Sequence, residues 1–463
     1  MIREFSLADA VRFAGGTCSS HRLSDVFFKN VSTDTRALKP GDLFVALRGD
    51  NFDGHRFLPA AEKLGACAAV VDTLDSNVDL PQVVVDDTVN ALAALAAGNR
   101  DESNAKLIAV TGSSGKTTVK ELSAAILGRM GDTLATRGNL NNHIGVPMTL
   151  LGLEPVQHYG VIELGASGIG EIAHTVAITR PQVVIVTNAG QAHLEGFGSY
   201  ENIVRAKGEI IEGVTDGGLV VLNRDDPAFG QWHERAGSRR VVSVSCCGNP
   251  GADYSAVIQK TKSFKPEIVV TGPGGWSCPL ILPLEGEHNV TNTLLAIAAT
   301  RELGATDAAI IEGLAGMQPV RGRLQVVSLP GELSVIDDSY NANPASMKAA
   351  LRVLASRGGQ RLAVLGAMGE LGPTALELHR EVGAFAAELG IDRLLTVGAG
   401  CDGYADGFGE MTEMYQTHRE AAQTIVCTNA RPMTVLVKGS RSAAMDIVVD
   451  EIKNKVNSTC CSG

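Results

Sequence analysis

A short run of glycine, serine, lysine and threonine at residues 111–118 has the composition of a phosphate-binding loop. It follows an apolar segment at 107–110 that is typical of a buried strand, and a helical pattern over 120–130 follows it. Glycines let backbone N–H groups close around phosphate oxygens, and the N-terminus of the next helix adds partial positive charge. A plain glycine turn before a helical lysine is the alternative, but strand, turn and helix together favour phosphate binding. The predicted phosphate-binding residues of the loop are Gly112, Ser113, Ser114, Gly115, Lys116, Thr117 and Thr118.

Two further polar residues follow apolar segments that resemble strands of the same sheet. Glu163 follows the segment 159–162, and His193 lies shortly after 183–186. Ligands of open parallel sheets collect beyond the carboxyl ends of the strands, where the phosphate loop also lies. In that position Lys116 reaches the β- and γ-phosphates, and the Thr117 hydroxyl and the Glu163 carboxylate suit Mg²⁺. A lone glutamate or histidine is more often structural, but their shared placement favours a joint nucleotide and metal site.

Composition and charge narrow the class of protein. The 463 residues carry a formal net charge of −11, and 44% of them are hydrophobic. We therefore expect a protein with large apolar cores and no nucleic-acid or anionic-membrane partner. The nine cysteines contain no C-x-x-C pair, which favours reduced thiols in the cytoplasm over a disulfide framework. The sequence shows neither a signal-peptide pattern nor a run of about 20 apolar residues, so we expect no membrane span.

The order of strand and helix patterns predicts an α/β protein with three domains. Residues 1–86 contain short β-type runs and one helical stretch over 56–64, and we expect a small α/β domain there. Residues 87–320 contain the phosphate loop and should form a central ATP-binding domain with a parallel sheet. Residues 321–463 again alternate strands with helices, which predicts a C-terminal Rossmann-like domain.

Other polar positions remain open to two interpretations from their residue types alone. The turns 32–36 and 48–55 are rich in Asp, Asn and Gly, which favours solvated turns. Asn289 and Asn292 share one helix face and either cap the helix or contact a base. Lys207, taken alone, should be a solvated lysine on a helix. Polar residues also follow the predicted strands of the third segment, as in an open-sheet binding site: Asp338, Asn341, Asn343, Lys438, Ser440 and Arg441.

Several short motifs, taken in order along nearly the whole chain, resemble the Mur ligase and folylpolyglutamate synthetase superfamily. Within it, residues 141–147, 193–199 and 338–344 are most similar to the branch that adds D-alanyl-D-alanine. The superfamily motifs are Thr111-Gly112-x-x-Gly115-Lys116-Thr117, Glu163, Asn188 to His193, His288-Asn289, Gly322-Arg323 and Asp338-Ser339.

The resemblance implies an ATP-dependent ligase of peptidoglycan synthesis that joins D-alanyl-D-alanine to UDP-N-acetylmuramoyl-tripeptide through an acyl phosphate. It implies two Mg²⁺ ions, held by Thr117, Glu163 and His193, with Lys207 as a carbamylated bridging ligand. Lys116, Glu163, His193 and Lys207 are then the expected catalytic residues. Asn289, Arg323 and Asp338 are expected to hold ATP. The implied substrate-binding residues are Ser32, Thr33, Asp34, Arg36, Asn51, Asn141, Asn142, Asn341, Asn343, Lys438 and Ser440.

Three alternatives stand beside this hypothesis. They are another Mur-type amino-acid ligase, a folylpolyglutamate synthetase, and a P-loop NTPase without ligase activity. A folylpolyglutamate synthetase is disfavoured because its ATP loop lies near the start of the chain. An NTPase switch leaves the third domain unexplained. We expect the protein to act as a monomer.

Overall fold

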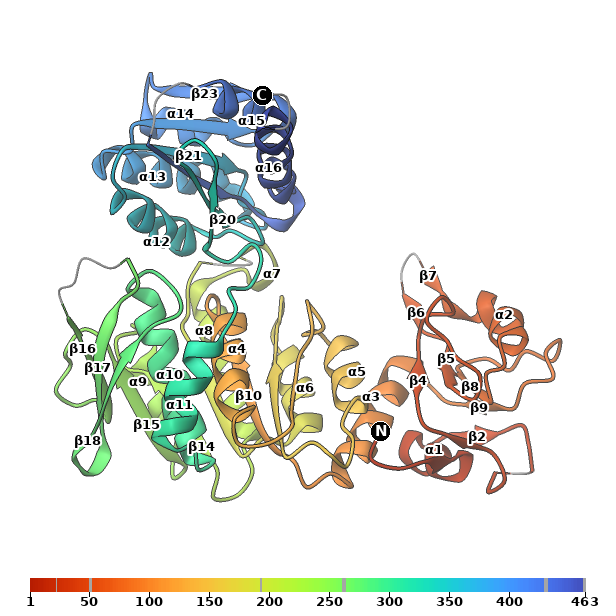
Figure 1. The fold of residues 1–463 in the computed structure, drawn as a ribbon. Coiled ribbons are helices and arrows are strands. Elements are labelled where there is room, and N and C mark those ends of the chain that lie inside the picture. Colours follow the sequence, from red (N-terminus) through yellow and green to blue (C-terminus); the bar gives the residue numbers. More distant parts are fainter. Residues whose placement is uncertain (22, 50–51, 192–193, 260–263, 429–431, 461–463) are drawn as a thin grey trace.

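Three successive segments of the chain each build their own principal β-sheet (Figure 1). The computed structural model describes the whole chain except residues 22, 50–51, 192–193, 260–263, 429–431 and 461–463. The three sheets confirm the predicted α/β class with three domains. Among the residues described, no helix is long and apolar enough to cross a membrane.

The first sheet has five strands in the order β2-β9-β8-β5-β4. A 3-10 turn, Gly54–Phe57, precedes α2, where the sequence predicted one continuous helix over 56–64. Asp53 causes this irregular start, because its side chain accepts a hydrogen bond from the His55 amide and caps the turn. The elements are α1 (Leu7–Ala14), α2 (Leu58–Lys63), β2 (Thr17–Cys18), β4 (Val31–Ser32), β5 (Leu43–Val45), β8 (Ala68–Val71) and β9 (Gln82–Val84), with the two-stranded pairs β1 (Phe5–Ser6) with β3 (Phe27–Phe28) and β6 (Arg48–Gly49) with β7 (Phe52–Asp53).

The helix α3 (Thr88–Asp101) joins the first sheet to the second. It packs against α1 on one side and against α5 and α6 of the middle domain on the other. Its buried Leu92 and Leu95 belong to one apolar core that continues from the N-terminal sheet into the middle domain. The two domains are therefore connected by a packed helix rather than by a loose linker.

The second sheet has nine strands in the order β11-β12-β10-β13-β14-β15-β16-β17-β18. The strands from β11 to β16 are parallel, but β17 and β18 continue the sheet antiparallel. The predicted parallel sheet is confirmed from β11 to β16, and β17 and β18 add an antiparallel edge to it, since the tight turn 273–275 between them permits only an antiparallel return. The strands are β10 (Lys106–Thr111), β11 (Thr133–Ala135), β12 (Tyr159–Glu163), β13 (Val183–Val186), β14 (Leu219–Asn223), β15 (Arg240–Ser245), β16 (Tyr254–Gln259), β17 (Glu267–Gly272) and β18 (Trp276–Ile281).

Helices cover both faces of this middle sheet. One face packs against α5, α6, α8 and α9, and the other against α4, α10 and α11. Buried apolar residues such as Val110 and Ile185 fill the strands, as expected for a sheet covered on both sides. The helices are α4 (Lys116–Leu127), α5 (Gly145–Leu151), α6 (Glu171–Thr179), α7 (Leu194–Phe197), α8 (Tyr200–Gly208), α9 (Phe229–Ala236), α10 (His288–Glu302) and α11 (Asp307–Gly316).

The third sheet has the order β19-β20-β24-β21-β22-β23, and only the β19–β20 pair is antiparallel. Two separate cores pack its faces, with α12, α13 and α14 on one side and α15 and α16 on the other. Its elements are β19 (Gln325–Leu329), β20 (Leu333–Asp338), β21 (Gln360–Gly366), β22 (Arg393–Val397), β23 (Thr412–Tyr415), β24 (Met433–Lys438), α12 (Pro344–Ala355), α13 (Ala375–Glu388), α14 (Asp402–Phe408), α15 (His418–Cys427) and α16 (Asp446–Cys460).

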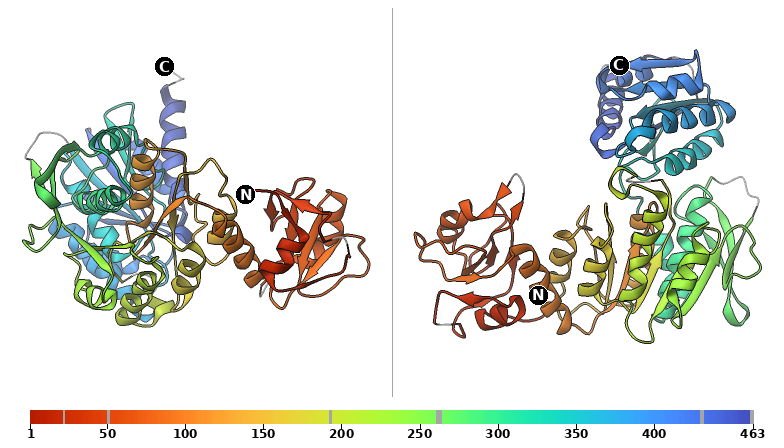
Figure 2. Two further views of the ribbon diagram at one scale, coloured as in Figure 1. Left: turned by 90° about the horizontal axis from the view of Figure 1, so that it is seen from below. Right: turned by 180° about the vertical axis from the view of Figure 1, so that it is seen from behind.

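The middle domain lies between the other two. The N-terminal domain projects sideways from it beyond α3, whereas the C-terminal domain lies over the end of the middle sheet at which α7 and α8 are found (Figures 1 and 2). The carboxyl ends of the middle strands thus face the C-terminal domain.

Candidate active site

The loop between β10 and α4 has the backbone shape of a phosphate cradle. Gly112 and Gly115 have φ angles of 147° and 81°, which residues with a side chain rarely adopt. A Cβ at Gly112 would lie 1.9 Å from the Thr187 hydroxyl oxygen, and one at Gly115 would lie 2.6 Å from an Asn292 side-chain oxygen. Both glycines are therefore required for the backbone to approach its neighbours and a ligand closely.

The end of β13 holds this loop in place. The Asn188 side chain accepts a hydrogen bond from the Ser114 amide at 2.9 Å and donates one to the Ser114 carbonyl at 3.1 Å. The Thr187 hydroxyl donates to the same carbonyl at 2.6 Å, and the Gly190 amide donates to the Ser113 hydroxyl at 2.9 Å. The loop is thus fixed before any ligand binds, which favours a preorganised site.

Lys116, the first residue of α4, folds back over the loop. Its Nζ donates to the Gly112 carbonyl at 2.6 Å and lies 3.4 Å from that of Ser113. Burial lowers the pKa of Lys116, the Glu163 carboxylate opposes this shift, and the Arg323 guanidinium adds to it. A polyanion in the loop would favour the charged form of the amine, as the predicted phosphate contact requires.

Glu163, at the end of β12, connects two other loops. Its carboxylate accepts hydrogen bonds from the Thr117 hydroxyl at 2.7 Å and from the Asn141 side chain at 2.8 Å. Its amide donates to the Thr136 hydroxyl at 2.9 Å, which fixes the end of the strand. A hydroxyl and a carboxylate are the hard oxygen donors that Mg²⁺ prefers, so these residues fit the expected nucleotide metal.

Lys207 is not the solvated helix lysine that its sequence context alone predicted. Its side chain on α8 is only 1% exposed, with Nζ 3.3 Å from the Ala166 carbonyl and 4.9 Å from the centre of the Phe197 ring. Burial lowers the pKa of Lys207 to about 7, and the charge of Lys116 contributes to the shift. Its amine is therefore partly neutral near pH 7. The expected partner His193 lies outside the described residues.

The C-terminal domain contributes a second set of polar groups. Lys438 donates to the Asp338 carboxylate at 2.5 Å and to the Asn341 carbonyl at 2.9 Å. The Arg323 guanidinium lies 4.3 Å from the centre of the Tyr340 ring. The Asn343 side chain donates to the Ser114 hydroxyl at 2.9 Å and so joins residues 229 positions apart in the sequence. This last bond connects the phosphate loop directly to the C-terminal domain.

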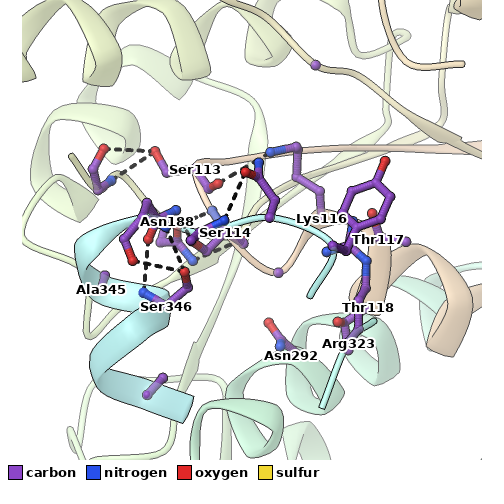
Figure 3. A pocket seen from close by; sticks show the side chains of 18 of the residues that line it. Ser113, Ser114, Lys116, Thr117, Thr118, Asn188, Asn292, Arg323, Ala345 and Ser346 are labelled. Atoms are coloured by element: carbon purple, nitrogen blue, oxygen red, sulfur yellow. Dashed lines mark hydrogen bonds between the residues drawn. The ribbon is translucent and has the colours of Figure 1, made fainter. Parts of the chain in front are cut away.

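These groups surround one cavity of about 630 Å³ between the middle and C-terminal domains, a volume typical of small-molecule sites. Figure 3 shows Lys116, Asn292 and Arg323 around this space. Gly112, Lys207 and Ser440 are not among its lining residues. The predicted residues that do line it are Ser113, Ser114, Gly115, Lys116, Thr117, Thr118, Asn141, Asn142, Glu163, Asn289, Arg323, Asp338, Asn341, Asn343, Lys438 and Arg441.

The sequence analysis assigned no role to Asn188, His288 or Tyr340 and left Asn292 open between helix capping and a base contact; all four residues line the cavity. The Asn292 side chain donates to the Asn289 oxygen at 2.9 Å, and Asn289 donates to the Glu285 carbonyl, so the pair is joined to the start of α10. Glu287 occupies the N-cap position without a side-chain hydrogen bond, and neither asparagine occupies it. Three of the four residues stood beside a predicted strand end or motif, which was the available signal.

The N-terminal candidates lie apart from this cavity. Asp34 and Arg36 form an ion pair at 2.6 Å, which lowers the pKa of Asp34 to about 2. The buried Ser32 hydroxyl donates to the Asp34 carbonyl at 2.9 Å, so this is a closed turn with Thr33 inside it. None of these four residues lines the cavity, and Asn51 lies outside the described residues. Their predicted role in substrate binding stays a prediction.

The chain matches three family profiles in the order of its domains. They are the Mur ligase family catalytic domain at residues 28–100, the Mur ligase middle domain at 110–300, and the Mur ligase glutamate ligase domain at 322–441. The middle profile contains the phosphate loop, Glu163 and Lys207. The third contains Arg323, Asp338 and Lys438.

Full-length relatives and solved structures agree with these profiles. The UDP-N-acetylmuramoyl-tripeptide–D-alanyl-D-alanine ligase of Escherichia coli K12 is 44% identical over 94% of this chain and 96% of its own length. A crystal structure of MurF from Acinetobacter baumannii superposes with a TM-score of 0.92 at 35% identity, covering 98% of this chain and 99% of that one. MurF from Thermotoga maritima in complex with ADP gives 0.84 at 27% identity, covering 93% and 98%. The chain therefore belongs to the Mur ligase family.

Proposed function

We propose that this protein is the ATP-dependent ligase that joins D-alanyl-D-alanine to UDP-N-acetylmuramoyl-tripeptide in peptidoglycan precursor synthesis. The observation that carries this proposal is the single cavity in which the phosphate loop, Glu163 and the basic side chains of the C-terminal domain meet. Relatives with this activity in their names match the chain over almost its whole length. The activity requires ATP, and no nucleic acid takes part.

Amide formation needs activation, because a carboxylate oxygen is a poor leaving group. In the proposed reaction a carboxylate oxygen of the tripeptide attacks the γ-phosphorus of ATP, which yields an acyl phosphate and ADP. The amine of D-alanyl-D-alanine then attacks the acyl carbon, loses a proton, and inorganic phosphate leaves. Backbone amides of residues 112–117 and the Lys116 ammonium hold the phosphates and offset the developing charge.

Mg²⁺ supplies charge neutralisation at the phosphates when bound, and the Thr117 hydroxyl and the Glu163 carboxylate suit the nucleotide ion. Asn141 orients Glu163 through its 2.8 Å hydrogen bond. We assign the base and ribose to Asn289, Arg323 and Asp338, which line the same cavity. Asn289 belongs to the middle domain, and Arg323 and Asp338 belong to the C-terminal domain, so the proposed nucleoside site lies between the two domains.

For the second Mg²⁺ we propose that carbamylated Lys207 is a ligand. A carbamate forms when a neutral amine adds to CO₂ and loses a proton, which turns a cation into an anionic oxygen ligand. The buried position of Lys207 and its pKa of about 7 support this step, since a neutral amine fraction is available at neutral pH. We include His193 as the other ligand of this ion.

Replacing Lys207 tests this proposal. We expect Lys207→Ala to lose most of its ligase activity and to regain part of it when formate or acetate fills the vacated ligand position. A control series with chloride at equal ionic strength separates rescue from a salt effect. Full activity of the variant without added carboxylate would refute a role for Lys207.

The remaining assignments follow the domain organisation. We propose that residues 1–86 bind the UDP portion of the substrate through Ser32, Thr33, Asp34, Arg36 and Asn51. We propose that residues 87–320 bind ATP and that residues 321–463 bring D-alanyl-D-alanine, using Asn341, Asn343, Lys438 and Ser440. Asn142 would contact the tripeptide substrate beside Asn141. We propose a monomer that acts in the cytoplasm, where ATP and UDP-linked precursors are found.

Phosphate release from ATP tests the function directly. The protein is incubated with ATP and Mg²⁺, with each substrate alone and with both together. We expect phosphate release, with an equal amount of UDP-linked pentapeptide, only when UDP-tripeptide and D-alanyl-D-alanine are both present. Release that depends on a single amino acid would indicate another Mur-type ligase, release that depends on folate and glutamate would indicate a folylpolyglutamate synthetase, and release without either acceptor would indicate a simple NTPase.

A further inference from the structure

Two adjacent cysteines and an aspartate gather at the carboxyl edge of the middle sheet, outside the groups assigned above. Asp225 follows β14, and Cys246 and Cys247 follow β15, the neighbouring parallel strand. One potential ligand atom from each residue lies within 4.8 Å of the other two. Among the described residues, these three form the one group of at least three His, Cys, Asp or Glu side chains that is this close.

Asp225 organises the loop that carries both thiols. One of its carboxylate oxygens accepts hydrogen bonds from the backbone amides of Cys246 at 2.8 Å and Cys247 at 3.2 Å. The other accepts one from the Ser245 hydroxyl at 2.6 Å. A carboxylate offers about four acceptor positions, so about one remains for a cation. The aspartate thus fixes the peptide and still offers an oxygen ligand.

The distance between the two sulfur atoms suits a shared metal ion better than a disulfide. Sγ of Cys246 lies 4.0 Å from Sγ of Cys247. A tetrahedral ion with metal–sulfur bonds of about 2.3 Å separates two sulfur ligands by about 3.8 Å. A disulfide prefers Cα atoms at least about 4.4 Å apart, whereas consecutive Cα atoms are about 3.8 Å apart. Chelation therefore requires less rearrangement than oxidation.

We propose that Asp225, Cys246 and Cys247 bind a thiophilic divalent cation such as Zn²⁺. Two thiolates and one carboxylate match the ligand preference of Zn²⁺, whereas Mg²⁺ prefers oxygen ligands alone. On binding, each thiol releases one proton and forms a metal–sulfur bond. Three protein ligands leave the fourth tetrahedral position for water.

The surroundings of the site provide an entry path and a link to the cavity. Cys247 is exposed, so an ion can reach its sulfur from solvent, and Cys246 is half-buried. The Thr291 hydroxyl donates a hydrogen bond to Sγ of Cys246 at 3.0 Å, and Thr291 also lines the nucleotide cavity. Such a donor stabilises a metal-bound thiolate and keeps its orientation. The cation site therefore adjoins the nucleotide cavity but has a different ligand set from the Mg²⁺ position.

Cadmium titration of the full-length protein tests the proposal, because cadmium–thiolate bonds absorb in the ultraviolet. The chain also contains a second adjacent pair, Cys460 and Cys461, which provides a matched control. In the variant Cys460→Ser/Cys461→Ser we expect one Cd²⁺ per chain, a full thiolate band and the release of about two protons. Adding Cys247→Ser to this variant should abolish most of the band. In the variant that keeps Cys247, Zn²⁺ should displace Cd²⁺. A thiolate band that persists after Cys247→Ser would overturn the proposal. Loss of the band on replacement of Cys460 and Cys461 alone would also overturn it.

Alkylation with iodoacetamide gives a second readout that does not depend on activity. Zn²⁺ should slow the labelling of Cys247 at least tenfold and leave the exposed Cys427 unchanged. Equal labelling of Cys247 with and without Zn²⁺ would contradict metal binding, and a loss of two hydrogen atoms from the peptide that carries both thiols would indicate a disulfide instead. An unchanged melting temperature of the metal-free Cys247→Ser variant verifies that it folds.

Discussion

The cavity between the middle and C-terminal domains and the N-terminal turn at residues 32–36 are both polar, but different contacts hold them together. In the cavity, hydrogen bonds join Ser114 to Asn188 and to Asn343, which are 74 and 229 residues away. In the turn, the ion pair joins Asp34 to Arg36, two residues away, and the charged groups are exposed. The first site is a product of tertiary structure, and the second is a product of local turn chemistry.

The phosphate loop is preorganised, whereas the N-terminal turn must still be brought to the cavity or connected to it by the substrate. The phosphate loop is fixed by β13 and already touches the C-terminal domain. None of the N-terminal residues that the structure describes lines the cavity. If that domain binds the UDP portion of the substrate, the substrate must extend across the molecule or the domain must move toward the cavity.

The largest expected effect is at Lys116. We expect Lys116→Ala to lower ligase kcat/KM about 1000-fold or more, because a positioned cation opposite developing phosphoryl charge is removed. Steady-state phosphate release measures the loss, and circular dichroism serves as the folding control. Turnover like that of the wild type would show that this cavity is not the ATP site.

The next largest expected effect is on the pH dependence of the unfolding free energy, through His288 at the cavity. Burial, together with Lys438 and Arg352, lowers the pKa of His288 to about 4. Its folded-state pKa lies below the ordinary value of about 6.5, so the unfolded chain binds the proton more readily between these values. The contribution of neutral His288 is therefore complete above about pH 6.5 and is lost as the pH falls toward 4, by about 3 kcal/mol at most.

Urea unfolding of the wild type and of His288→Gln between pH 4 and 7 checks this linkage. We expect the wild type to lose more unfolding free energy than the variant across that range. Parallel curves for the two proteins would refute the assigned titration and leave the cavity without this pH-sensitive contribution.

A smaller effect should follow from loss of the contact between domains. Asn343 both caps α12 and donates to Ser114, so Asn343→Ala would combine two effects. Asn343→Ser keeps a capping side chain but is too short to reach Ser114. We expect about a tenfold loss of kcat/KM for ATP, which corresponds to about 1.4 kcal/mol, with an unchanged melting temperature. A kcat/KM equal to that of the wild type would show that this contact contributes nothing to catalysis.

The smallest expected effect is in the N-terminal turn. We expect Arg36→Ala to raise the KM for UDP-tripeptide about fivefold and to leave the KM for ATP unchanged, because the turn lies outside the ATP cavity. Lys39→Ala, a nearby exposed lysine, is the matched control. A rise in the KM for ATP alone would contradict the division of roles between the two regions.

Several features were predictable from the sequence because they depend on local patterns. The strand, glycine turn and helix around residues 107–118 together predict a phosphate loop. The regular alternation of strands and helices likewise predicted the α/β class, and Glu163 was identified by its place after a strand. The turn at 32–36 also forms from its own side chains.

Other features depend on contacts between distant segments, which residue spacing does not encode. Lys207 is buried because α8 packs against the segment that carries Ala166, and its pKa falls for that reason. The strands β17 and β18 add an antiparallel edge to the predicted parallel sheet. The sequence by itself determined the class of fold and the phosphate loop, through periodicity and glycine placement. Only the tertiary structure decided which side chains share the cavity and which cysteines face an aspartate, because packing sets distance, burial and charge.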